Sequence, residues 1–477
     1  MEAASSGAPR PWGARVYGLR LLYVPRGRRT VAIACAIVAV LDYLKEALGD
    51  IATIDHRPLK FDFGQFQRAA QDLSAGHNPY DVFLSMHCTQ WCLGGYIYTP
   101  LIAEVLRPLA HIPLPRAATV WLVLSHLMVV ATALLLWRAL RGRTTTTALA
   151  AMLAAGLLYQ PLFENFSYVQ IGPLLLLIMT GSAALCLCSA PHRTALAGAL
   201  IGLATVIKVT PILAAPALLP PGWARRGPGD RARVLEGIAG IGGLVGAATA
   251  LILLMLLFVP FTADFFTQVL PHIGGGTTVY ENKSFPAFIA RVFEFTGEAE
   301  PGWHLGPPSS AAVTILGMLI FLGSTTWVAA RIALRPGAEI PARAAAFAAY
   351  VAAMPIASTI TWRHHVSVNI LAMALLLPSL WPREGAGSSR AARWLLVASY
   401  PLTYIQQDFA HHLALPHPLD HPTLLDVMRV VMIDDLNLFG MVCLWLACVL
   451  ALRGLRVVRV PLTSPAPARE PQTAAAV

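Results

Sequence analysis

Residues 117–137 read AATVWLVLSHLMVVATALLLW, a run of twenty-one positions without a single Asp, Glu, Lys or Arg. A helix rises ~1.5 Å per residue, so a run of this length crosses the ~30 Å hydrocarbon core of a bilayer. The whole chain has a matching composition, with 56% hydrophobic and 13% charged residues. Soluble proteins carry roughly 25% charged residues, so the sequence predicts an integral membrane protein.

Apolar runs recur along the chain with no polar domain between them, and they predict one membrane domain over residues 30–460. The candidate segments are 30–48, 117–137, 145–162, 171–190, 235–260, 311–331, 342–360, 366–381, 394–407 and 436–452. We expect an all-α fold of about twelve transmembrane segments, because one further apolar run is best divided into two short helices.

That further run covers residues 194–220 and is interrupted by Lys208 and Pro211. Arginines flank it on both sides, at Arg193 and Arg225, and arginines in short loops mark the cytoplasmic side. A single crossing cannot place both ends on one side. We therefore predict two short helices that reverse near Lys208, because broken helices occur at membrane depth where the backbone lines a cavity.

The remaining loop arginines predict that both termini lie in the cytoplasm. Residues 1–29 then form a cytoplasmic N-terminal segment and residues 461–477, rich in Pro and Ala, a disordered cytoplasmic tail. The long loops 49–116 and 261–310 fall on the outer side, together with most other polar residues. The expected location is the cell membrane, with an extracytoplasmic site.

Charge and cysteine usage exclude other classes of protein. The net charge of +10 comes from short basic clusters beside apolar runs, so we expect membrane lipids as partners and no nucleic acid. Five of the seven cysteines lie in apolar runs, and only Cys88 and Cys92 lie in a polar loop. A lone C-x3-C lacks a second ligand pair, so a disulfide or free thiols are favoured over a metal site.

The first outer loop opens with Phe61-Asp62-Phe63, followed by expected interfacial helices at 64–75 and 101–111. An aspartate between two phenylalanines beside an apolar surface can hold a raised pKa and act as a general base. Asp62 can equally be the N-cap of the helix that follows, and spacing alone favours the cap.

A series of short motifs follows in order along the chain. They are Asp62, Gly76-x-Asn78-Pro79-Tyr80, Tyr98-x-Pro100, Trp121, Asn165 with Gln170-x-x-Pro173, Lys208-x-x-Pro211, Asn282-x-Ser284 with Arg291, and Ser358-x-x-x-Trp362-x-His364-His365. Their order and spacing over residues 55–370 resemble glycosyltransferase family 87, of the GT-C superfamily of membrane enzymes that use polyprenyl-phosphate sugars.

The resemblance implies a GT-C-type helical bundle that transfers one sugar from a polyprenyl-phosphate donor to an envelope glycolipid or glycan. The sugar is mannose in most members and arabinofuranose in some. The aspartate that matches Asp62 is the family's general base, which favours the catalytic role over the cap. Arg363 departs from the family, which often has an acidic or small residue before the histidine pair, and this puts donor or acceptor preference in doubt.

The candidate site combines residues for three tasks. Asp62 is the expected catalytic base. The residues expected to bind the donor phosphate are Lys208, Arg291, Arg363, His364 and His365, and those expected to bind substrate are Asn78, Tyr80, Tyr98, Asn165, Gln170 and Asn282. Arg363 and the histidines can instead be interfacial residues, with the arginine snorkelling to the head groups, and Asn282 also fits an N-x-S sequon.

We expect no metal and no cofactor. A departing phosphate monoester can be stabilised by Lys, Arg or His alone, and the chain contains no Asp-x-Asp to chelate a metal–diphosphate. A lipid or sugar transporter is the competing class of function. Transporters bind near the bilayer midplane and often have internal repeats, whereas here no convincing repeat occurs and the polar residues crowd one face.

Overall fold

The computed structural model describes residues 25–56, 62–85, 95–188, 190–225, 230–274, 276–277, 279, 281–294, 309–383, 389–405 and 423–456. Within these residues helices make up the regular structure and no strand occurs. The predictions for Cys88 and Cys92, for most of the 1–29 segment and for the 461–477 tail fall outside the described residues.

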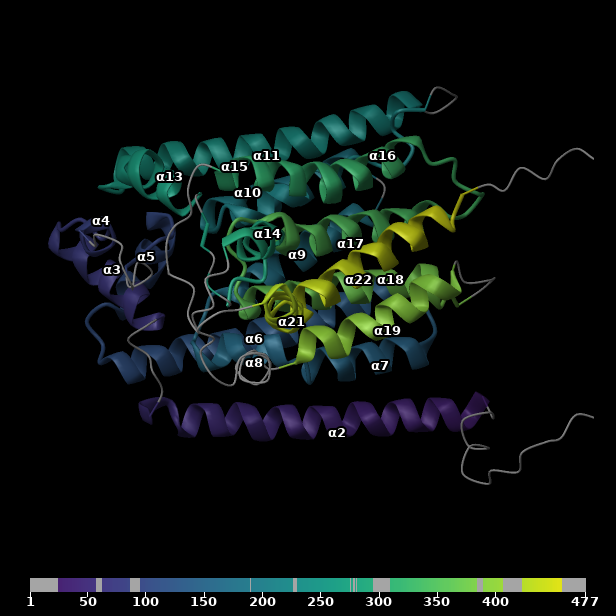
Figure 1. The fold of residues 1–477 in the computed structure, drawn as a ribbon, viewed down its shortest axis with the longest axis horizontal. Helices are drawn as coiled ribbons and strands as arrows, with labels where there is room; N and C mark the ends of the chain where they lie inside the picture. The colour runs from purple at the N-terminus through teal and green to yellow at the C-terminus, as the bar shows by residue number, and fades with distance from the viewer. Residues whose placement is uncertain are drawn as a thin grey trace, which may run out of the picture.

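The long helices run mostly along one direction and form a bundle, with α2 along one edge (Figure 1). Their bounds are α2 Pro25–Ala52, α6 Leu114–Leu140, α7 Thr146–Leu157, α9 Gly172–Cys186, α10 Pro191–Ile207, α11 Asp230–Phe258, α15 Ser309–Met318, α16 Ser324–Arg331, α17 Glu339–Ala357, α18 Asn369–Leu380, α19 Arg390–Tyr404 and α22 Leu436–Arg453. All ten predicted apolar segments coincide with helices in this set.

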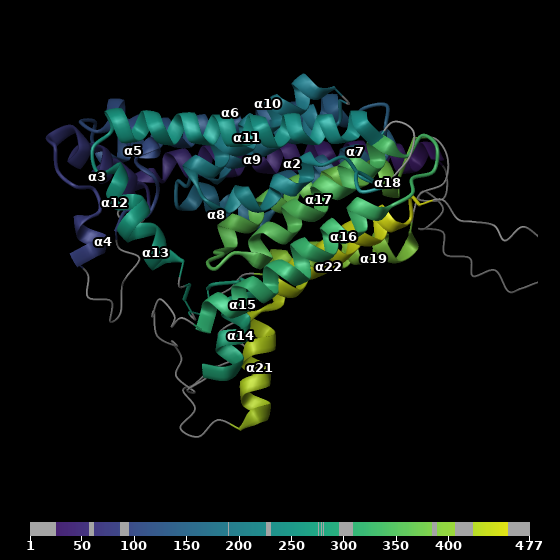
Figure 2. The ribbon, with the colours of Figure 1, turned by 90° about the horizontal axis from the view of Figure 1, so that it is seen from above.

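Short elements connect the long helices. The α-helical ones are α3 Phe63–Ala75, α4 Asp81–Ser85, α5 Pro100–Leu106, α8 Gln160–Ser167, α12 Thr262–Asp264, α13 Leu270–Ile273, α14 Phe285–Glu294 and α21 Leu424–Asp434. The 3-10 turns are η1 Ile54–His56, η2 Arg107–Leu109, η3 Thr210–Leu218 and η6 Arg363–Val368, and the π-helical ones η4 Phe265–Val269 and η5 Leu319–Gly323. Helices α3, α4, α5 and α13 lie at one end of the bundle, and α14 and α21 project from it (Figures 1 and 2).

Six helical stretches among the described residues are long and apolar enough to cross a membrane. They are Leu114–Leu140, Thr146–Ser167, Arg231–Phe258, Ala311–Arg331, Glu339–Ala357 and Leu436–Arg453. The chain is therefore a multi-pass membrane protein, but the expected number of about twelve crossings is not confirmed. Two of the expected segments show why: α2 carries Asp42, Lys45 and Glu46 in its second half, and α9 has only 15 residues.

The predicted break at Lys208 is present, and the chain reverses there. Helix α10 ends at Ile207, and the 3-10 turn η3 begins two residues after Lys208. A Cβ on Gly240 would meet both Thr194, near the start of α10, and Leu218, at the end of η3. The two ends of the 194–220 run therefore lie at the same level of the bundle, as the flanking arginines predicted.

Helices α10 and α11 run parallel in close contact because glycines face each other. A Cβ on Gly198 would lie 1.9 Å from the carbonyl oxygen of Gly240, and one on Gly243 would lie 2.0 Å from that of Ala195. Small residues at such positions let two membrane helices approach backbone to backbone. This contact fixes the direction of α10 and so the place where Lys208 emerges.

The centre of the bundle is formed by α17 and α18. Every residue of α17 from Ala344 to Ala357 is buried, as is every residue of α18. The turn that joins these two buried helices, Ser358 to Val368, carries the predicted histidine pair. The histidines are thus held by the most enclosed part of the molecule.

Candidate active site

Lys208 marks the point where a helix ends beside a cavity. Its own backbone is extended, with φ −148° and ψ 125°, although its N–H still donates to the Ala204 carbonyl. The hydroxyl of Thr99 donates to the Val206 carbonyl at 2.6 Å, which satisfies one of the carbonyls left open at the helix end. Thr99 also ties the first loop to this point, so the lysine and the loop share one frame.

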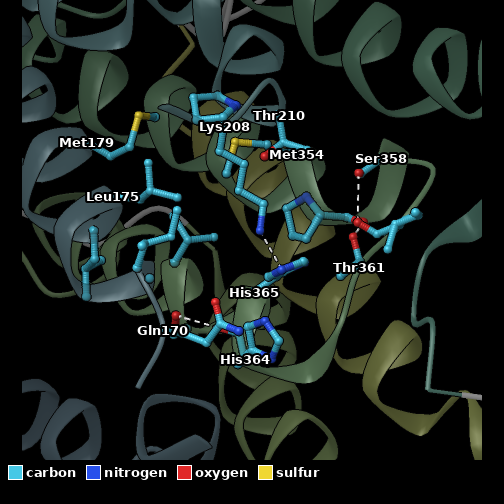
Figure 3. Close-up of a pocket in the computed structure, with 18 residues that line it drawn as sticks. Gln170, Leu175, Met179, Lys208, Thr210, Met354, Ser358, Thr361, His364 and His365 are labelled. Carbon is cyan, nitrogen blue, oxygen red and sulfur yellow. Dashed lines mark hydrogen bonds between the residues drawn. The ribbon is translucent and has the colours of Figure 1, made fainter. Parts of the chain in front are cut away.

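The Lys208 side chain points into a cavity between the start of α9, the end of α17, η3 and η6 (Figure 3). Its Nζ atom lies 2.5 Å from Nε2 of His365. The polar side chains that line the cavity are Gln170, Lys208, Thr210, Ser358, Thr361, His364, His365 and Ser367, and its other walls are largely apolar. An amine, two imidazoles, a carboxamide and four hydroxyl side chains therefore line one space.

The two histidines are fixed by their turn. The Trp362 backbone N–H donates to Nδ1 of His365 at 3.1 Å, which turns Nε2 toward Lys208. The His364 ring stands nearly perpendicular to that of His365, with 4.4 Å between their centroids. Burial, and then the charge of Lys208, lower the pKa of His364 to about 3, so this ring is a neutral hydrogen-bonding group at neutral pH.

Asp62 stands at the start of α3, but its side chain makes no capping hydrogen bond. Burial raises the pKa of Asp62 to about 6, against the opposing effects of a hydrogen bond with the Gln170 side chain and the charge of Lys208, while Glu281 adds to the rise. The carboxylate is thus joined to the cavity through Gln170. The Asp62 side chain thus lacks the capping hydrogen bond and sits where burial raises the pKa of its carboxyl.

Tyr98 joins the two charged groups of the site. Lys208 Nζ lies 5.6 Å from the centre of its ring, within the range of a cation–π contact, and the negative charge of Asp62 raises the Tyr98 pKa further after burial has done so. Phe66 packs against the same ring with 5.0 Å between centroids. Of the predicted substrate-binding residues, Tyr98 and Gln170 are the two that reach the Asp62–Lys208 region.

Asn78 and Tyr80 hold the first loop in shape instead of facing the cavity. The Asn78 carboxamide oxygen accepts from the Tyr80 N–H at 3.0 Å, and its nitrogen donates to Asp264 at 2.9 Å. The fully buried Tyr80 donates its hydroxyl to the Tyr98 carbonyl at 2.9 Å and stacks on Tyr96. Both residues therefore act on the site by placing Tyr98.

Asn165 and Asn282 are buried and bind backbone on either side of the histidine turn. The Asn165 nitrogen donates to the His364 carbonyl at 2.8 Å. The Asn282 nitrogen donates to the Thr359 carbonyl at 2.9 Å, and its oxygen accepts from the Thr361 N–H at 2.8 Å. The structure thus brings both residues to the site; the protein occupies the whole Asn282 carboxamide but only the nitrogen of Asn165, whose side-chain oxygen is buried without a partner among the described residues.

The two predicted arginines lie in ion pairs away from the cavity wall. Arg291 pairs with Asp435 at 2.5 Å. Arg363, the residue that departs from the family pattern, pairs with Glu164 at 2.5 Å and donates to the Tyr404 carbonyl at 2.7 Å. Of the five cationic candidates, Lys208 and the two histidines meet in the cavity and the arginines do not.

Sequence reasoning missed several residues that shape the site. Thr210, Thr361 and Ser367 line the cavity, as does Ser358, which the sequence marks only as the first residue of a motif, and Thr99 fixes the end of α10. Nothing marks Thr99 in the sequence except its place in the Tyr98-Thr99-Pro100 motif. Among the described residues no group of three or more His, Cys, Asp or Glu side chains is placed to hold a metal ion.

Comparison with known proteins finds one matching family model and one similar solved structure. A family model described as glycosyltransferase family 87 matches residues 96–359, more than half of the chain. The crystal structure of ArnT from Cupriavidus metallidurans bound to undecaprenyl phosphate is similar with a TM-score of 0.40 and 15% identity, over 87% of this chain and 76% of that chain. No curated protein sequence matches. The matched residues include Tyr98, Gln170 and Lys208 but not Asp62 or the histidine pair.

Proposed function

Because this chain belongs to glycosyltransferase family 87, we propose that it transfers a single mannose from a polyprenyl-phosphate donor to an envelope glycolipid or glycan, with inversion at the anomeric carbon. One observation carries the proposal: Lys208 and His365 meet at a helix break, in a cavity that Gln170 joins to Asp62. A phosphate-binding group and a base therefore flank one space, as a sugar transfer requires.

The donor phosphate belongs beside Lys208 and His365. Hydrogen bonds between a charged donor and a phosphate oxygen are roughly twice as strong as neutral ones, and a dry site strengthens them further. His364 and the hydroxyls of Ser358 and Thr361 add neutral partners. Positive charge placed here stabilises the phosphate as it leaves, without a bridging metal.

Asp62 is the proposed general base. As the acceptor hydroxyl attacks, a bond forms between its oxygen and the anomeric carbon, and the hydroxyl proton passes to the Asp62 carboxylate. The bond from the anomeric carbon to the phosphate oxygen breaks, and its electron pair leaves with the polyprenyl phosphate. A pKa of about 6 leaves roughly 90% of the carboxylate ionised at pH 7 while making it a stronger base than an ordinary aspartate.

A polyprenyl-phosphate arabinofuranose donor would have the same leaving group, polyprenyl phosphate, so the phosphate site does not distinguish the two sugars. An assay with each donor decides between them. The test incubates the purified protein with each polyprenyl-phosphate sugar and, in parallel, with nucleotide sugars, against a panel of envelope glycolipids. We expect product from the mannose donor. Product from arabinofuranose alone would change the sugar, and product from nucleotide sugars alone would refute the donor class. Movement of the donor across liposomes without any product would favour a flippase.

We also propose that the site faces the outside and both termini the cytoplasm. The first described helix begins, and the last one ends, at the end of the bundle opposite α3 and α5 (Figure 1). A membrane-impermeant thiol reagent tests this orientation in a background free of native cysteines. His77→Cys should be labelled from outside intact cells and Glu339→Cys only after lysis, and the reverse pattern would invert the topology.

A further inference from the structure

We infer that the buried ion pair between Arg291 and Asp435 is a positioning device that holds the active-site histidine turn in place. The inference rests on the proposed function, since it assigns the pair a part in that reaction. It also replaces the sequence-based expectation that Arg291 binds the donor phosphate. Asp435 lies beyond residues 96–359, so the device uses a part of the chain outside the family match.

The pair is enclosed and balanced in charge. Arg291 on α14 is 3% exposed, and Asp435, between α21 and α22, is fully buried. The guanidinium meets both carboxylate oxygens, at 2.5 and 3.3 Å. Beside it Lys283, also fully buried, donates its Nζ to the Asp434 carbonyl at 2.6 Å. The ion pair and a buried lysine therefore lie side by side where water is excluded.

From this pair the guanidinium reaches a second part of the chain. Its Nη1 donates to the Val279 carbonyl at 2.8 Å, and its Nη2 donates to the Asn282 carbonyl at 2.9 Å. One side chain thus fixes a carboxylate and two backbone carbonyls at once. Only the planar fork of arginine has donors for all of these partners, since a lysine offers a single nitrogen.

The loop that Arg291 holds is in turn bound to the turn before the histidines. The Lys283 N–H donates to the Thr361 carbonyl at 2.7 Å. The Asn282 carboxamide oxygen accepts from the Thr361 N–H at 2.8 Å. Thr361 therefore has both of its backbone groups bound by this loop, which leaves it no freedom to shift alone.

Thr361 is followed directly by Trp362, whose N–H orients the His365 ring toward Lys208. A continuous series of hydrogen bonds and one peptide link therefore runs from Asp435 to the Nε2 atom of His365. If Asp435 loses its charge, the buried guanidinium loses the carboxylate that holds it from two sides and must rearrange. The loop, Thr361 and the His365 ring would move with it.

A second ion pair provides the matched control. Arg343 on α17 and Glu236 on α11 form a bidentate pair at 2.5 and 2.8 Å, with side chains only 12% and 8% exposed. Arg343 lies 15 residues before Ser358 on α17, about 22 Å from the site at ~1.5 Å per residue. Breaking it costs stability in the same way, but no contact within the described part of the chain joins it to His365.

The experiment compares Asp435→Asn with Glu236→Gln by activity per folded molecule and by hydrogen exchange at the amides of Thr361 and His365. We expect Asp435→Asn to lower kcat at least tenfold, to shift the pH–rate profile and to speed exchange at both amides at least tenfold. Glu236→Gln should stay within twofold of wild type in each respect. Asp435→Glu, which restores the charge, should recover part of the loss.

Equal behaviour of the two variants, or wild-type kcat and exchange in Asp435→Asn, would overturn the inference. If Asp435→Asn does not fold, Asn282→Ala decides, because it cuts the same series without touching the ion pair. Wild-type exchange at Thr361 and His365 in Asn282→Ala would then refute the inference. The exchange measurement does not depend on catalysis, so an inactive wild-type protein would refute the proposed function and leave this test intact.

Discussion

Replacing Asp62 by asparagine separates the catalytic reading of this residue from a structural one. Asparagine keeps the size and the hydrogen bond with Gln170 but cannot take a proton from the acceptor. General acid–base catalysis contributes typically 10²–10⁴-fold, so we expect kcat to fall by at least ~10²-fold. Because Asp62 acts on the acceptor, the affinity for polyprenyl phosphate should stay nearly unchanged.

The same substitution should raise the stability of the protein at neutral pH, although it lowers activity. The Asp62 pKa rises from 3.8 to about 6 on folding, so the folded state favours the protonated side chain. Stability from this group is full below pH 3.8 and is lost as the pH rises toward 6, which at pH 7 amounts to at most ~3 kcal/mol at 1.36 kcal/mol per pKa unit. Asparagine removes this cost. The free energy of unfolding of the variant should exceed that of wild type by about 1–3 kcal/mol at pH 7. This difference should vanish near pH 4.

Transfer assays over a range of pH and thermal unfolding at pH 4 and 7 test both expectations. Wild-type kcat should decline below a pH near 6, as the Asp62 carboxylate is protonated, and the residual activity of Asp62→Asn should lack that limb. Near wild-type turnover in Asp62→Asn would remove Asp62 from the mechanism and leave His364 or His365 as the next candidate base. A role as helix cap would instead be indicated if Asp62→Asn kept its activity and stability while Asp62→Ala lost ~1 kcal/mol of stability with only a modest loss of activity.

Three further results are expected. Lys208→Met should weaken polyprenyl-phosphate binding by roughly 10–150-fold, the value of a charged hydrogen bond of about 1.5–3 kcal/mol, and unchanged binding in a titration would place the phosphate elsewhere. EDTA should leave transfer intact, and activity lost to the chelator and restored by a divalent ion would contradict this. In Gly172→Ala the new Cβ would lie 1.8 Å from the Asn165 side-chain oxygen, so the free energy of unfolding should fall by about 1–3 kcal/mol. An unchanged melting temperature would show that the Asn165 side chain can move away without cost.

Much of the fold could be predicted from the sequence because a helix needs about 20 consecutive apolar residues to cross the hydrocarbon core of a bilayer. The break near Lys208 was predictable, since a lysine and a proline interrupt an apolar run whose two ends both carry arginine. The number of crossings was not predictable to the same degree. Helix α2 is long enough to cross but carries Asp42, Lys45, Glu46 and Asp50 in its second half, and residues 163–167, which lie outside the predicted apolar segments, are helical as part of α8.

The site was predictable in its residue types but not in its pairings. The lysine and the histidine pair carry their chemistry wherever the chain places them, and the structure brings them together. Arg291 and Arg363 carry the same charge in the sequence, yet Asp435 lies 144 residues from the first and Glu164 lies 199 residues from the second. The sequence shows that such an arginine is charged but does not show its partner. An arginine held in an ion pair and one free to bind a phosphate therefore cannot be told apart from the sequence. The same holds for Asn165 and Asn282, whose side-chain nitrogens donate to backbone carbonyls.

The position of the donor phosphate tests the account most directly. The measurement is a cryo-EM map of the protein in nanodiscs with a non-transferable polyprenyl-phosphate mannose analogue. We predict phosphate density within hydrogen-bond distance of Lys208 Nζ and His365 Nε2, with the anomeric carbon turned toward Asp62. Phosphate density at another place, with the cavity between Lys208, His365 and Gln170 left without ligand, would contradict it.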